Sequence, residues 1–201
     1  MKRILAAAAV VAAILGQGSP ALADVPTAGQ LEKGLLTQSD LPKPYEIAFP
    51  AVPVETSLGE STPRCPEPAV PDGPTVNTTN EFFLDTDGSM ITMTIIATGA
   101  GAARDAVKDA AAIPGRCPVF EKGNTSFTTK AFPLAEFGDA STAFDMSVKE
   151  GKDSPVRVVV AVVAAGDVCA LFALTPNEEN DEAEFRTIVT AGVKKLALIK
   201  H

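Results

Sequence analysis

Two adjoining apolar segments near the C-terminus, VRVVVAVVAA (156–165) and DVCALFAL (167–174), constrain the fold most strongly. A strand with one face in water alternates apolar and polar residues, and neither segment does so. The turn residues Ala165-Gly166-Asp167 between them predict a hairpin. We therefore expect the two strands at the centre of a sheet, with protein covering each side.

Other segments extend this sheet. The sequence STAFDMSVKE (141–150) alternates and predicts a half-buried strand, and TSFTTKAFPL before it predicts another. Two apolar runs flank Asp87-Gly88, which is a strong signal for a tight hairpin. An alanine-rich helix follows and is stopped by Pro114-Gly115.

A helix is predicted at each end of the mature chain. Near the start, Leu31, Leu35 and Leu36 share a helical face that ends before Pro42. At the other end, Thr175 is expected to cap a helix that carries Lys194 and Lys195 near its negative end. The order of elements predicts an α+β fold, with a single antiparallel β-sheet and helices packed mainly on one face.

Residues 1–23 predict a secretory signal peptide. Lys2 and Arg3 precede a short apolar run, and Ala21-Leu22-Ala23 has the A-x-A pattern of a cleavage site. We expect cleavage between Ala23 and Asp24, and a secreted or cell-envelope protein that does not span a membrane. Residues 24–201 are long enough for one domain with its own core.

Acidic residues dominate the charge. The formal net charge is −8, and removing the two cations of the signal leaves −10. Nucleic acids and anionic membranes are themselves polyanions, so both are disfavoured as partners. The chain has no tryptophan and one tyrosine, Tyr45, which argues against a surface for stacking sugars or bases.

The region 50–78 is rich in proline and has little periodicity. We expect a long extended loop there. The loop could form a cleft wall or a mobile flap, and a merely tolerated insertion is an equal alternative.

The three cysteines of an exported chain imply one bridge and one thiol left over. Cys65 and Cys117 each lie in a turn before proline, so we expect them to pair. Cys169 lies in an apolar strand, where a thiol acts as a small hydrophobic side chain. Pairing of Cys117 with Cys169 stays open as the alternative.

Catalytic chemistry has few candidates. The only histidine is the last residue, His201, so a Ser-His-Asp or Cys-His arrangement has no base and a histidine-ligated zinc site is excluded. Gly99 and Gly101 follow a strand and open a helix, as in a dinucleotide-binding fingerprint, but Arg104 occupies the position of its third glycine. The glycines are explained more simply by a strand-to-helix turn. A paired-carboxylate hydrolase stays formally possible through Asp85, Asp87, Asp139 or Asp145, although nothing in their spacing favours it. We therefore expect that the protein is not an enzyme and that it binds neither a cofactor nor a metal ion.

The opening GLLTQSDLPKPYE, the later RCPVF and the segment LAEFGDASTAF (134–144) together resemble actinobacterial exported sensor-like domains. These domains are similar to the extracellular domain of PknH-type serine/threonine kinases. The resemblance covers nearly all of residues 30–198, and none of its motifs is catalytic. It implies a domain that senses or binds something outside the cell through a cleft beside the sheet.

We therefore expect an exported, non-catalytic binding or sensor-like domain for an extracellular small molecule or cell-envelope ligand. Its cleft would lie between the proline-rich loop and the sheet, near Tyr45, Phe49, Phe82 and Arg104. The alternative is a protein–protein interaction module or secreted envelope accessory protein. It would use a sheet edge or the acidic start of the C-terminal helix, which carries Glu178, Glu179, Asp181, Glu182 and Glu184.

Overall fold

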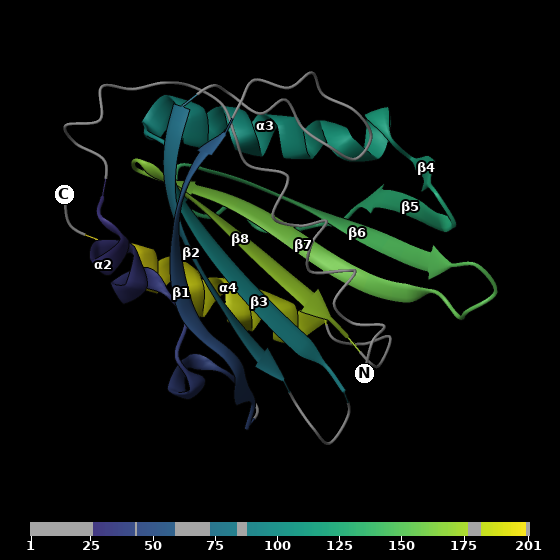
Figure 1. Ribbon diagram of the computed structural model, residues 1–201, viewed down its shortest axis with the longest axis horizontal. Coiled ribbons are helices and arrows are strands. Elements are labelled where there is room, and N and C mark those ends of the chain that lie inside the picture. Colours follow the sequence, from purple (N-terminus) through teal and green to yellow (C-terminus); the bar gives the residue numbers. More distant parts are fainter. Residues whose placement is uncertain (1–25, 43, 59–72, 84–87, 177–181, 200–201) are drawn as a thin grey trace.

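The computed structural model describes residues 26–42, 44–58, 73–83, 88–176 and 182–199. These residues form one eight-stranded sheet with few helices (Figure 1). The strands are β1 (Glu46–Leu58), β2 (Gly73–Phe83), β3 (Met90–Ala97), β4 (Val119–Lys122), β5 (Thr125–Ala131), β6 (Ala140–Glu150), β7 (Val156–Ala165) and β8 (Val168–Thr175). The helical elements are α2 (Ala28–Leu31), η3 (Glu32–Gly34), η4 (Gln38–Asp40), α3 (Ala100–Arg116) and α4 (Glu182–Leu196).

All neighbouring strands are antiparallel, in the order β1-β2-β3-β8-β7-β6-β5-β4. The β7–β8 hairpin pairs Ala165 with Val168 across Gly166-Asp167 and occupies the middle of the sheet. Both strands are buried along nearly their whole length. The predicted central hairpin is confirmed.

The β7 side chains divide between two cores. Val159, Ala161 and Val163 belong to a core shared with α4 and the N-terminal segment. The alternate β7 positions belong to a second core with α3. Figure 1 shows α3 along the upper part of the view and α4 crossing the strands lower down.

The predicted α+β class, with helices mainly on one face, is therefore wrong. The fold is dominated by the eight-stranded antiparallel sheet, and its few helices lie on opposite faces. The physical reason is the central hairpin, since strands that are apolar on both faces need a covering layer on each side.

The predicted extended loop at 50–78 is wrong at both of its ends, which belong to strands. Strand β1 continues to Leu58, and β2 begins at Gly73. Pro50 and Pro53 are compatible with β1 because this strand lies at the sheet edge, where one row of backbone groups has no partner strand. The pairing with β2 is irregular between Ile47 and Val52. Residues 59–72 lie outside the described part of the chain.

Both predicted helix boundaries near the termini also need correction. The N-terminal segment is three short helical turns rather than one helix, although Leu31, Leu35 and Leu36 are buried as expected. Thr175 does not cap α4, because it is the last residue of β8 and pairs with Met90. The residues that follow, 177–181, are outside the described ranges, as is most of the turn predicted at Asp87-Gly88.

Helix α4 packs unusually closely on the sheet at one position. A Cβ added to Gly192 would lie 2.6 Å from Cζ of Phe172, whose side chain is fully buried in β8. The absence of a side chain at Gly192 therefore allows the helix to rest directly on the aromatic ring. The neighbouring buried residues on this face of α4 are Phe185, Ile188, Val189 and Leu196.

We predict that Gly192→Ala destabilises the fold by about 1–3 kcal/mol, because the added methyl overpacks a closed core. Gly101→Ala is the matched control: an added Cβ there has no neighbour within 4 Å. It should be neutral or stabilising by up to about 1 kcal/mol, since alanine is the better helix former. Denaturant unfolding measures both variants. Equal stability of the two would refute close packing of α4 on Phe172.

Candidate functional site

The four residues predicted to line a cleft do not converge. Tyr45 and Phe82 are fully buried in the core on the α4 side, where the Tyr45 hydroxyl donates to Glu184 Oε1 at 3.0 Å. Phe49 is 55% exposed on edge strand β1. Arg104 lies on α3, on the opposite side of the sheet, with Nη2 3.9 Å from Asp139 Oδ2. The proline-rich wall of the predicted cleft, 59–72, lies outside the described residues.

The motif FGDAS has a structural role next to the central hairpin. Gly138 has φ of +59°, and an added Cβ would collide with the carbonyl oxygen of Ala164. The backbone N–H of Asp139 donates to that oxygen at 2.8 Å, and Asp139 Oδ2 accepts from the N–H of Gly166 at 2.9 Å. The carboxylate thus fastens the β5–β6 connection onto the β7–β8 turn.

The other carboxylates considered for catalysis are not arranged as an acid–base pair. Asp145 on β6 is buried, and its carboxylate is held by Arg157 Nε at 2.8 Å and Lys130 Nζ at 3.5 Å. Asp85 and Asp87 belong to the undescribed 84–87. Within the described ranges, no group of three or more histidine, cysteine or acidic side chains is placed to hold a metal ion.

Cys169 is a free cysteine, fully buried in β8. Burial raises the pKa of its thiol to about 12. The alternative bridge between Cys117 and Cys169 is therefore wrong, and Cys169 fills the core as expected. Cys117 is buried at the end of α3, while Cys65 lies outside the described residues, so the Cys65–Cys117 bridge stays a prediction.

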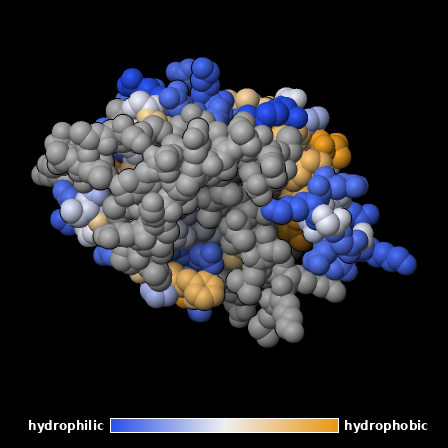
Figure 2. Space-filling view, turned by 45° about the horizontal axis from the view of Figure 1, so that its top comes forward, coloured by the Kyte–Doolittle hydropathy of each residue, from blue (hydrophilic) through white to orange (hydrophobic). Residues whose placement is uncertain are grey.

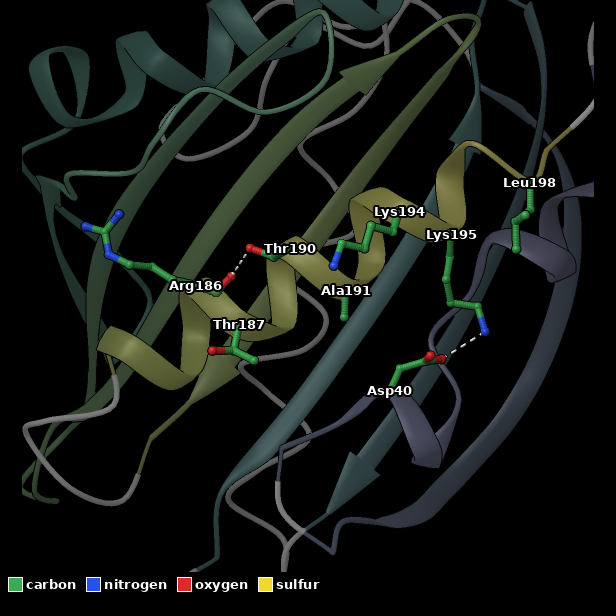
Figure 3. Close-up of a pocket in the computed structure, with 8 residues that line it drawn as sticks. All are labelled: Asp40, Arg186, Thr187, Thr190, Ala191, Lys194, Lys195 and Leu198. Carbon is green, nitrogen blue, oxygen red and sulfur yellow. Dashed lines mark hydrogen bonds and ion pairs between the residues drawn. The ribbon is translucent and has the colours of Figure 1, made fainter.

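A pocket of about 570 Å³ lies beside α4. Because α4 buries its opposite side in the sheet, this pocket is formed by the polar side of the helix and by η4. We call it the α4 groove (Figure 3). Its lining residues are Asp40, Arg186, Thr187, Thr190, Ala191, Lys194, Lys195 and Leu198.

One wall of the α4 groove is closed by an ion pair. Lys195 Nζ donates to Asp40 Oδ2 at 2.9 Å and joins the end of α4 to the N-terminal segment (Figure 3). The same carboxylate accepts from the N–H and hydroxyl of Thr37, at 2.7 and 2.6 Å. Burial raises the pKa of Asp40, but the hydrogen bonds from Lys195 and Thr37 and the charge of Lys195 outweigh it, so the pKa lies below its ordinary value.

The other end of the groove is held by Arg186. Its Nη2 donates to Glu182 Oε1 at 2.6 Å and to the carbonyl oxygen of Pro133. Its guanidinium carbon lies 5.8 Å from the ring centroid of Phe132, within cation–π range. Arg186 thus connects α4 to the segment after β5.

Lys194 lies between these two anchored ends and makes no ion pair with any described residue. Figure 3 shows its side chain extending along the helix toward Thr190. The groove therefore presents an uncompensated cation in a chain whose formal net charge is −8.

Sequence reasoning missed the α4 groove for two reasons. The polar side of an amphipathic helix is ordinarily solvated, and the sequence relates Lys194 and Lys195 only to the negative end of the helix dipole. Asp40 is also 155 residues from Lys195, so no local pattern could pair them. The available signal was a pair of lysines in a strongly acidic chain.

No known protein-family model matches the sequence, and no curated protein matches it. Across the described part of the chain, no helix is both long enough and apolar enough to cross a membrane.

We predict that native Cys169 resists iodoacetamide at pH 8, because a thiol with a pKa of about 12 is protonated and this one is also buried. Unfolding without reductant should expose one alkylatable thiol, and Cys169→Ala should remove it. Intact mass spectrometry counts the added groups. Rapid labelling of the native protein would contradict burial, and three labelled thiols would contradict the predicted Cys65–Cys117 bridge.

We predict that Asp40→Asn lowers the free energy of unfolding by about 1 kcal/mol at pH 7, because it removes the charge partner of Lys195 and weakens the Thr37 contacts. The pKa of Asp40 is lowered on folding, so its contribution is present above its ordinary value of 3.8 and is lost as pH falls through the folded value. The difference between the two proteins should therefore shrink at acid pH. Denaturant unfolding from pH 7 to pH 3 measures it.

Asp105→Asn, at an exposed position of α3, is the control and should leave stability unchanged over the same pH range. A deficit in Asp40→Asn that stays constant into acid pH would show that the charge on Asp40 contributes nothing.

Proposed function

We propose that this protein is an exported, non-catalytic binding module and that its ligand occupies the α4 groove. The observation that carries the proposal is the uncompensated Lys194 between two anchored ends of an open pocket. A volume of about 570 Å³ suits a small molecule.

The anchoring of the groove supports this proposal. Lys195–Asp40 and the contact of Arg186 with the Pro133 carbonyl oxygen hold the two ends, and the buried contact of Gly192 with Phe172 fixes the helix between them. A site held by such contacts is organised before the ligand arrives, which lowers the entropy lost on binding. The signal peptide predicted at 1–23, which lies outside the described residues, and the resemblance to PknH-type sensor domains are consistent with a ligand outside the cell.

A second candidate function is a protein–protein interaction module that uses strand β1. This edge strand exposes Ile47 (57%) and Phe49 (55%), and Phe49 pairs with Glu81, whose pKa is raised by burial. Sheet edges with exposed apolar side chains are common sites of strand addition. Among the residues that Figure 2 colours by hydropathy, mainly around the rim of the view, most are hydrophilic and a few apolar patches lie between them.

Native mass spectrometry of the protein purified from its own host tests the first function. We expect a small-molecule adduct that is present under native conditions and lost on denaturation. Thr187→Trp should abolish the adduct, because a bulky indole at this exposed lining position fills the groove.

Ala112→Trp is the matched control, since it places the same bulk on the exposed face of α3 and should keep the adduct. A bare wild-type chain, or an adduct that survives in Thr187→Trp, would overturn the assignment of the groove. A protein partner that is retained by Thr187→Trp but lost from Phe49→Ser would instead support binding at β1.

A further inference from the structure

The hydrogen-bonding capacity that remains in the α4 groove defines the chemistry of its ligand. The Thr187 hydroxyl donates to the carbonyl oxygen of Ala183 at 2.9 Å, and the Thr190 hydroxyl donates to that of Arg186 at 2.7 Å. A hydroxyl has one proton to donate and two lone pairs. Both threonines have therefore used their donor within the helix and offer acceptors to a ligand.

The three cations of the groove differ in whether their hydrogen-bond donors are already used. Lys195 is held by Asp40, and Arg186 is held by Glu182 and the Pro133 carbonyl. Lys194 keeps its ammonium donors for a ligand, because it has no charged partner among the described residues. Among the residues that the structure describes, the groove thus offers one positive charge without an ionic partner.

These groups form one stripe along the helix. Thr187, Thr190 and Lys194 are spaced three and four residues apart, so they are neighbours on one face, about 5–6 Å from each other. Leu198, which is 54% exposed, extends the stripe with an apolar end. The order along the groove is acceptor, acceptor, cation and apolar contact.

We propose that the α4 groove binds a small polyhydroxylated anion. An anionic group pairs with Lys194, and hydroxyls about one helical turn away donate to Thr190 and Thr187. This inference rests on the proposed function and adds the class of ligand. A carboxylate and a phosphate offer the same anionic oxygens, so a sugar acid and a polyol phosphate both fit.

Titrations of ¹⁵N-labelled protein, followed by amide chemical shifts, test the ligand class. The probes are glucuronate, glycerol 3-phosphate, glucose and glucosamine. We expect the two anions to shift the amides of residues 186–198 at millimolar concentrations, with glucose at least tenfold weaker and glucosamine weaker still. The relative affinity of the two anions distinguishes a carboxylate ligand from a phosphate ligand.

Lys194→Gln should weaken the better anion about tenfold and remove most of its salt dependence, because the charge is lost while most of the side-chain length is kept. Lys152→Gln, in the exposed turn between β6 and β7, is the matched control and should change nothing. Thr187→Val keeps the shape of threonine without its acceptor. It should weaken the binding of glucuronate but not that of acetate, an additional probe that has the carboxylate without the hydroxyls.

Glucose or glucosamine binding as tightly as glucuronate would overturn the inference, as would the absence of any shift at residues 186–198. A different result would refute the proposed function: native mass spectrometry would detect the wild-type protein without any bound small molecule. An adduct in the groove whose mass and composition lack an anionic group would refute the ligand class and leave the binding function in place.

Discussion

The burial of β7 and β8 on both faces is the constraint on which the rest of this structure depends. Val158, Val160 and Val162 face α3, while Val159, Ala161 and Val163 face the other core. At about 25 cal/mol per Å², neither row of side chains can be left in water without a large loss of stability. The chain therefore supplies a cover for each face, and the two major helices are divided between them.

The groove follows from this division. One side of α4 is committed to the sheet through Gly192 and Phe172, so the polar side must face outward, next to η4. The contact between η4 and α4 is in turn fixed by Asp40, whose carboxylate accepts hydrogen bonds both from Thr37 in its own segment and from Lys195 on α4. A packing requirement in the core thus determines where a pocket can form on the surface.

The parts of the fold predicted correctly were those whose signal is local. Alternation in β6, the apolar pair β7–β8 and the alanine-rich α3 can each be identified within about 20 residues of sequence. The predicted fold class failed although one of its own premises, a hairpin covered on both sides, was right. That premise requires helices on both faces, but sequence alone did not show which helix covers which face. The cap predicted at Thr175 failed because pairing with Met90 overrode local capping chemistry.

The candidate site was harder to predict, because the role of each groove residue depends on which side chain it contacts. The sequence predicts Tyr45 and Phe82 beside a cleft, but burial of apolar surface is the commonest role of aromatic side chains, and both lie in the core. The groove residues are ordinary for a helix surface until their partners are known. Lys195 and Arg186 become structural once Asp40 and Glu182 are placed beside them. Only then does Lys194 stand out as the groove cation without an ionic partner among the described residues. The functional signal is thus a difference between three similar cations, and three-dimensional structure was needed to reveal it.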